Sequence, residues 1–118
     1  MSLELAKKIV KILSDKKALN VEVIDISEVS ELADYFIICS GTSSTHVKTL
    51  ADEVEFKIGG RDKDVMYHKE GYSSATWVLL DFRDVIVHIF YGETRDFYNL
   101  EHLWTDGKKL DADKLLEE

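Results

Sequence analysis

Apolar residues recur at helical spacing in two parts of the chain. In residues 3–17 they return every three to four positions, with lysines between them. The second part, residues 47–58, is followed by the pair Gly59-Gly60. Its apolar positions are Val47, Leu50, Ala51, Val54 and Ile58. Each pattern predicts an amphipathic helix with one buried stripe, and glycine is typical just beyond a helix end.

Other apolar stretches have the length and composition of β-strands. The clearest are residues 21–26, 34–40, 75–81 and 84–91, and residues 64–69 are a weaker candidate. Most of these stretches are rich in β-branched and aromatic side chains, which favour strands. The last two strong stretches are so close in sequence that they are predicted to form an antiparallel hairpin.

The order of these elements predicts an α/β fold, with helices packed on a small mixed β-sheet. Residues 93–104 are expected to hold a final short helix, so the order is helix, two strands, helix, three strands, helix. Residues 105–118 are polar and charged, which indicates a loose tail or a short, fraying helix. A length of 118 residues fits one domain, which we place at residues 1–104.

The two hairpin strands are apolar on both faces. A sheet that helices cover on one side only should alternate apolar and polar residues, and residues 76–80 and 85–91 do not. Either both faces are covered within the domain, or one face docks onto a partner or a second copy of the chain.

Charge and composition narrow the classes of function. The chain has 15 basic and 23 acidic residues, a net charge of -8. Binding to a nucleic-acid backbone depends on many Lys and Arg contacts, so a basic protein surface is a better expected partner. The single cysteine, Cys39, lies in an apolar run, which indicates a buried thiol and excludes an internal disulfide framework. With no signal peptide and no apolar run of about 20 residues, the protein is expected to be cytoplasmic and not membrane-bound.

Residues 41–44, Gly-Thr-Ser-Ser, join an apolar strand to a helix and form the candidate nucleotide site. A P-loop ends in a lysine and a dinucleotide fingerprint has three spaced glycines, and this loop has neither. A nucleotidyltransferase needs two carboxylates one residue apart on a strand to hold Mg²⁺, whereas Asp81 and Asp84 are three apart. A tight turn with a Ser or Thr N-cap is therefore favoured. The alternative is a nucleotide-binding or nucleotidyl-transferring enzyme that uses this loop.

The histidines and tryptophans suggest no catalytic or metal centre. The four histidines are scattered, without the spacing of a zinc site. His88 lies inside an apolar strand and needs a hydrogen-bond partner, for which Asp81 or Asp84 is the hypothesis. Trp77 is a candidate interface anchor, because tryptophan is enriched at interface hot spots.

Three segments, in this order, closely resemble the Iojap, or ribosomal silencing factor, family. They are ADYFIICSGTSSTHVKTLADEVE (33–55), EGYSSATWVLLDFRDVIVHIF (70–90) and TRDFYNLEHLW (94–104). The resemblance implies a nucleotidyltransferase-like fold without catalysis and without a cofactor. It also implies that the chain binds ribosomal protein fourteen of the large subunit and blocks joining of the small subunit, which represses translation. Organelle relatives are tied to assembly of the large subunit.

The resemblance further implies a partner-binding surface on the sheet, with little direct contact to nucleic acid. Its implied members are Trp77, Glu70, Gly71, Tyr72, Asp81, Asp84 and His88. A homodimer through the same apolar face is a further possibility to test. The chain departs from the family at Arg83, where glycine is usual, and at Tyr91-Gly92, where proline often follows the strand. Arg83 adds a positive charge near a surface that is expected to meet a basic partner.

Overall fold

In this computed structural model, the described residues (2–28, 33–59, 68–91 and 108–110) form two α-helices and six strands. The helices are α1 (Ser2–Asp15) and α2 (Ser44–Val54), and α2 continues into a π-helical turn, η1 (Glu55–Gly59). The strands are β1 (Leu19–Asp25), β2 (Tyr35–Gly41), β3 (His68–Glu70), β4 (Trp77–Asp81), β5 (Val85–Tyr91) and β6 (Lys108–Leu110). The first two predicted helices and the four stronger strands are confirmed. The helix predicted at residues 93–104 lies outside the described part.

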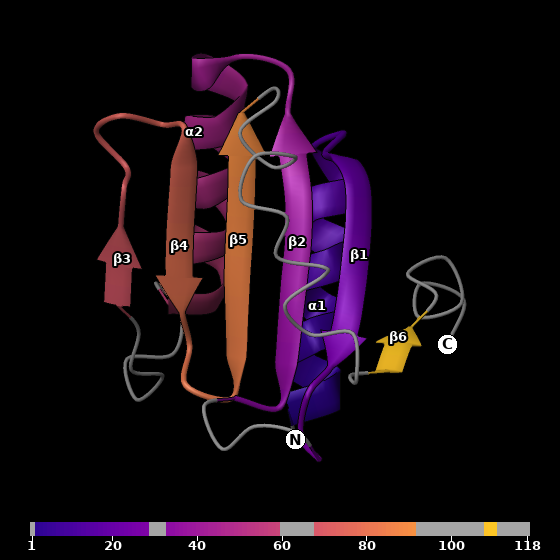
Figure 1. Cartoon of the computed structure of the whole chain (residues 1–118). Helices are drawn as coiled ribbons and strands as arrows, with labels where there is room; N and C mark the ends of the chain where they lie inside the picture. The colour runs from indigo at the N-terminus through magenta and orange to yellow at the C-terminus, as the bar shows by residue number, and fades with distance from the viewer. Residues whose placement is uncertain (1, 29–32, 60–67, 92–107, 111–118) are drawn as a thin grey trace.

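The strands form one mixed sheet in the order β3-β4-β5-β2-β1-β6 (Figure 1). The central pair, β2 and β5, is parallel, and all other neighbours are antiparallel. β4 and β5 form the antiparallel hairpin expected from the sequence, with Trp77 opposite Phe90 and Leu79 opposite His88. The predicted α/β fold with a mixed sheet is therefore confirmed.

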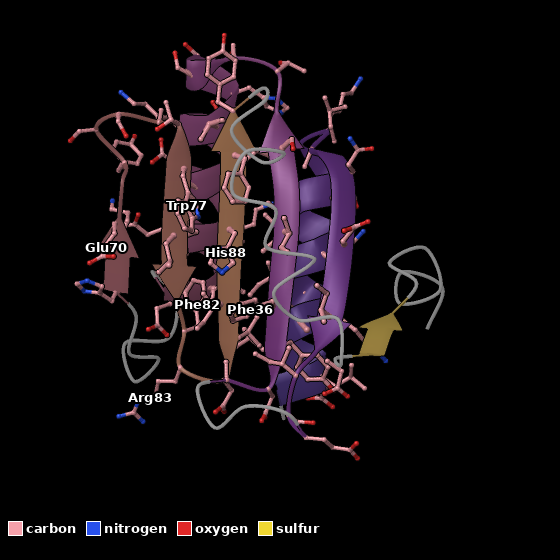
Figure 2. All side chains as sticks on the ribbon, in the orientation of Figure 1. Phe36, Glu70, Trp77, Phe82, Arg83 and His88 are labelled. Atoms are coloured by element: carbon pink, nitrogen blue, oxygen red, sulfur yellow. The ribbon has the colours of Figure 1, made fainter. Side chains whose placement is uncertain are left out.

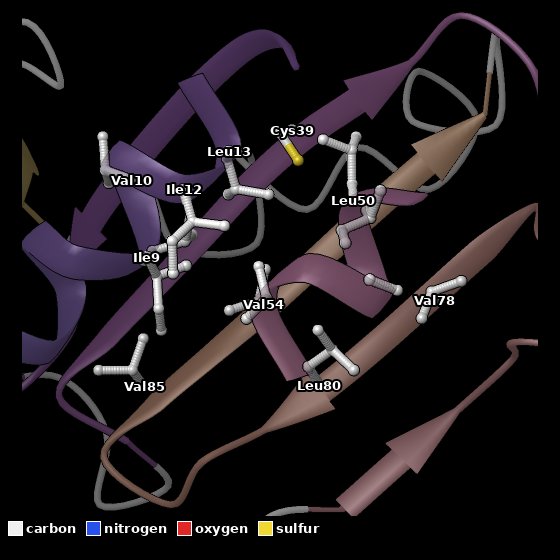
Figure 3. Close-up of a cluster of buried hydrophobic side chains, with 14 of the residues drawn as sticks. Ile9, Val10, Ile12, Leu13, Cys39, Leu50, Val54, Val78, Leu80 and Val85 are labelled. Carbon is white, nitrogen blue, oxygen red and sulfur yellow. The ribbon is translucent and has the colours of Figure 1, made fainter. Parts of the chain in front are cut away.

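Both helices lie on the same face of the sheet, behind it in Figure 1. The apolar stripe of α1 and the apolar stripe of α2 meet alternate residues of the strands, because successive side chains of a strand point to opposite faces. The resulting helix-side core is shown in Figure 3, and Cys39 is fully buried in it, as expected. None of the described helices is long and apolar enough to cross a membrane.

The second face of the sheet carries its own apolar cluster. The buried members of this cluster are Ile24, Ile26, Ala33, Phe36, Ile38, Ile86 and Phe90. Trp77 and Leu79 of β4 pack against it but are only half-buried, and Glu70 of β3 is exposed. The second face is thus buried at its centre and accessible along β3 and β4. This arrangement explains why the hairpin strands are apolar on both sides.

One prediction is wrong at residues 108–110. These residues form strand β6, which pairs antiparallel with β1, rather than part of a loose tail or a helix. The outer edge of β1 offers backbone donors and acceptors that a short strand can pair with, and lysines are common on edge strands. The local sequence carries no sign of this, because the partner of β6 lies more than 80 residues earlier in the chain.

Candidate functional site

Trp77 lies where the second face of the sheet becomes accessible. Pairing of β3, β4 and β5 places Glu70 beside Leu79, and Leu79 beside His88. Cross-strand partners share a face of the sheet, so these side chains and Trp77 all lie on the face away from the helices. We call Glu70, Trp77, Leu79 and Asp81 the outer margin, and exposed His68, which pairs with Asp81, borders it with its Nε2 3.1 Å from Glu70 Oε1.

Aromatic rings hold Trp77 in place (Figure 2). Its indole stacks on Phe90, with ring centroids 5.3 Å apart and ring planes 24° apart. The indole Nε1–H donates a hydrogen bond of 3.0 Å to Nδ1 of His88. The His88 ring in turn meets the Phe36 ring edge-on at 4.9 Å. Offset stacking and edge-on contacts are the favoured arrangements of aromatic rings.

The partner of His88 is therefore Trp77, and the hypothesis that Asp81 or Asp84 bonds to it is wrong. Asp81 is engaged elsewhere, since its Oδ1 accepts from the backbone N–H of Arg83 at 2.8 Å. Because Nδ1 of His88 accepts a hydrogen bond, the ring proton sits on Nε2. That Nε2 is buried and makes no hydrogen bond to the described residues. Burial lowers the pKa of His88 from 6.5 to about 4.

The lowered pKa of His88 predicts a loss of stability in mild acid. The folded protein holds His88 neutral, whereas the unfolded chain takes up a proton below about pH 6.5, so lowering the pH favours unfolding. Between pH 6.5 and 5, the free energy of unfolding should fall by about 2 kcal/mol through this residue. Urea unfolding of the protein and of a His88→Leu variant at both pH values isolates the effect. Equal pH dependence of the two proteins would contradict the prediction.

Gly71 positions the start of β4 from the turn that precedes it. It has a φ of +80°, and an added Cβ would overlap the carbonyl oxygen of Trp77. The Gly71 carbonyl accepts from the backbone N–H of Ala75 at 3.1 Å and from Ser74 Oγ at 3.2 Å. Only glycine fits this close approach with a left-handed backbone. Gly71 therefore acts on Trp77 through the backbone.

Tyr72 lies on the other side of the sheet from Trp77. Its hydroxyl donates to Asp52 of α2 at 3.1 Å, and Lys69 Nζ lies over its ring, 4.5 Å from the centroid. Lys69 also forms an ion pair with Glu55 of η1 at 2.9 Å. Tyr72 packs against the helix-side core. It ties the turn before β4 to the helix layer and does not join the outer margin.

The hairpin turn between β4 and β5 uses both of the aspartates singled out in the sequence. Asp81 closes the turn through Arg83, as described above. The carbonyl of Asp84 accepts from the backbone N–H groups of Asp34 and Tyr35, at 2.7 and 3.1 Å. Asp84 is exposed in the turn, which its backbone joins to the start of β2.

Arg83 has a φ of 73°, a left-handed conformation that favours glycine. Glycine, which the family resemblance implies at this position, would adopt the conformation without strain. We expect Arg83→Gly to be more stable than Arg83→Ala by about 1 kcal/mol, because alanine keeps the strain while both remove the side chain. Thermal or urea unfolding of the two variants measures this, and an Ala variant as stable as the Gly variant would refute it.

The loop at residues 41–44 uses its polar groups within the protein. A Cβ at Gly41 would lie 2.8 Å from Val47 Cγ2, so glycine lets the end of β2 approach α2 closely. Ser43 caps α2 by accepting from the N–H of His46 at 3.0 Å. His46 Nδ1 accepts from the N–H of Thr42 at 2.9 Å, so its Nε2–H donates to the carbonyl of Lys16, also at 2.9 Å. The N–H groups of Thr42 in the loop and of His46 in the first turn of α2, which could hold a phosphate, are thus occupied.

The structure brings together only part of the predicted set. Trp77, Glu70 and Asp81 lie on the outer margin and His88 lies directly against it, whereas Gly71 and Asp84 shape turns and Tyr72 faces the helices. Phe90 and Phe36 were missed as supports of Trp77. Phe90 could have been found from the two-residue period of β5 around His88, but Phe36 depends on the parallel pairing of β2 with β5.

Comparison with known proteins points to one family. Residues 1–118 match the family model described as "Ribosomal silencing factor during starvation". The chain is 36% identical over 113 residues to "Ribosomal silencing factor RsfS" of Halalkalibacterium halodurans, covering 96% of both chains. It is 40% identical over 100 residues to the protein of the same name in Bacillus subtilis, covering 84% of this chain and 83% of that one.

The fold is shared with solved structures. A crystal structure of a Chromobacterium violaceum protein has a TM-score of 0.80 at 34% identity and covers 92% of this chain and 88% of that chain.

A more distant relative is the mouse protein "Mitochondrial assembly of ribosomal large subunit protein 1", 31% identical over 99 residues. The match covers 82% of this chain and 43% of the mouse protein.

Proposed function

Because the chain belongs to the ribosomal silencing factor family, we propose that it binds the large ribosomal subunit in the cytoplasm and blocks joining of the small subunit. The direct partner is ribosomal protein fourteen, and the effect is to repress translation without a catalytic step. The observation that carries the proposal is the outer margin, where a half-buried tryptophan shares one face of the sheet with Glu70 and Asp81. The name of the mouse relative, "Mitochondrial assembly of ribosomal large subunit protein 1", supports the choice of subunit.

The chemistry of the outer margin suits a basic protein partner. Trp77 offers a large, fixed apolar surface, which is the typical centre of an interface. Glu70 is exposed and Asp81 is half-buried, and both lie on the same face as Trp77. With a net charge of -8, the whole molecule also favours encounter with a positively charged surface.

Sedimentation with purified ribosomal subunits tests the proposal. The protein is expected to travel with large subunits and not with small ones, and to lower the fraction of joined ribosomes as its concentration rises. Cross-linking followed by mass spectrometry should then identify ribosomal protein fourteen as the neighbour of the outer margin. Unchanged subunit joining at a protein concentration that saturates the large subunit would contradict occlusion.

The alternative function is nucleotide binding at residues 41–44. The occupied N–H groups of Thr42 and His46 and the close contact of Gly41 with Val47 argue against it. Calorimetry with ATP and Mg²⁺ separates the two functions. We expect no binding heat, and a clear isotherm that a Ser43→Ala substitution abolishes would favour the alternative.

A further inference from the structure

A histidine at position 88 lowers the stability of the fold. Its ring is buried in an apolar cluster, with Nε2 unbonded to any described residue. A buried donor without an acceptor lowers stability, and burial also opposes protonation of the ring. A leucine or phenylalanine would fill the site without either cost. Packing alone therefore does not explain a histidine here.

What the histidine adds is an acceptor for the indole of Trp77. The 3.0 Å hydrogen bond from Trp77 Nε1 ends on His88 Nδ1, which belongs to the neighbouring strand (Figure 2). Stacking on Phe90 sets the plane of the indole. A stacked ring can still slide or turn over on its neighbour, because stacking alone opposes these motions only weakly. The hydrogen bond fixes which edge of the indole faces the sheet and which edge faces outward.

We propose that His88 is a positioning residue that holds Trp77 in its binding orientation before the partner arrives. Its role is to reduce the ordering that binding would otherwise require, which is the general gain of a preorganised interface. His88 does not touch the partner in this scheme and acts only through Trp77. The effect on binding rests on the proposed function, whereas the effect on the indole does not.

Two variants of nearly equal size separate the acceptor from the ring. In His88→Asn, the side-chain oxygen is attached to Cγ, as Nδ1 is in histidine, so it can accept from the indole. His88→Leu has a similar shape and no acceptor. Both lose the ring contact with Phe36, so a difference between them reports on the hydrogen bond.

The first measurement needs no partner. Exchange of the Trp77 indole N–H with water is followed by NMR, and a Trp77→Phe variant distinguishes its signal from that of Trp104, the other tryptophan. Exchange should be slow in the wild type and the Asn variant, and at least about tenfold faster in the Leu variant. Equal exchange in the wild type and the Leu variant would overturn the proposal.

The second measurement is affinity for purified large ribosomal subunits. The Leu variant is expected to bind about tenfold more weakly, and the Asn variant within about threefold of the wild type. Wild-type affinity in the Leu variant would overturn the proposal. If the wild type itself does not bind, the proposed function fails, and the indole measurement still decides the role of His88.

A double-mutant cycle covers the case in which the Asn variant does not fold. Trp77→Phe keeps the stacked ring and removes the N–H donor. If His88 acts through that donor, adding His88→Leu to Trp77→Phe should weaken binding no further. A full additional tenfold loss in the double variant would show that His88 contacts the partner or supports the fold by another route, and would overturn the proposal.

Discussion

Replacing Gly71 by alanine is expected to lower the free energy of unfolding by about 3 kcal/mol or more. Two effects add. The residue has a φ of +80°, which is strained for any side chain, and the new Cβ would overlap the carbonyl oxygen of Trp77. Backbone atoms of a paired strand cannot move aside without breaking the β3–β4–β5 ladder. Urea unfolding followed by circular dichroism measures the change.

The control for Gly71→Ala is Ser73→Ala, at an exposed position of the same turn. It should leave stability within about 0.5 kcal/mol of the wild type. If Gly71→Ala proves as stable as this control, the turn is not held against Trp77 in the way the structure indicates. A folded Gly71→Ala protein should also bind large subunits less well, because the displaced carbonyl belongs to Trp77.

Replacing Trp77 by alanine is expected to weaken binding to large ribosomal subunits by about 2 kcal/mol or more, roughly thirtyfold in affinity. The substitution removes the largest side chain of the outer margin and leaves the helix-side core untouched. The variant should therefore remain folded, as circular dichroism can confirm. Co-sedimentation at several protein concentrations gives the affinity.

Phe56→Ala is the matched control for Trp77→Ala. Phe56 is the most exposed of the large apolar side chains in the described residues, at 66%. It lies on η1, which continues α2 on the helix side of the sheet, away from the outer margin. Its truncation should leave affinity unchanged. Normal co-sedimentation of the Trp77→Ala variant, or an equal loss in Phe56→Ala, would show that the docking surface has been placed wrongly.

The residues that the family resemblance implied as one binding surface have different roles in the structure. The outer margin includes the side chains of Trp77, Glu70 and Asp81. His88 supports Trp77 by accepting its indole hydrogen bond. Gly71 supports Trp77 through the backbone, whereas Tyr72 anchors the preceding turn to α2. A stretch that reads as one motif in the sequence thus divides between two faces of a sheet, because neighbouring residues on a strand or turn point in opposite directions.

The sequence by itself determined helices α1 and α2, the four longer strands, the fold class and the family. Helical periodicity and β-branched runs are local signals, because each element must bury one stripe or one face of its own side chains. The short gap between residues 81 and 84 likewise required the β4–β5 hairpin. The sequence also argued against a nucleotide site at residues 41–44, since a P-loop needs a lysine and a nucleotidyltransferase needs a carboxylate pair for Mg²⁺.

Only the tertiary structure decided which residues meet. The bond between Trp77 and His88, the support from Phe36 and the pairing of β6 with β1 all depend on strand register and strand order. These join residues that are 11 to more than 80 positions apart, and nothing in the local pattern selects one such pairing over another. Register is chosen by the packing of whole faces, so the role of His88 becomes visible only after the sheet has formed.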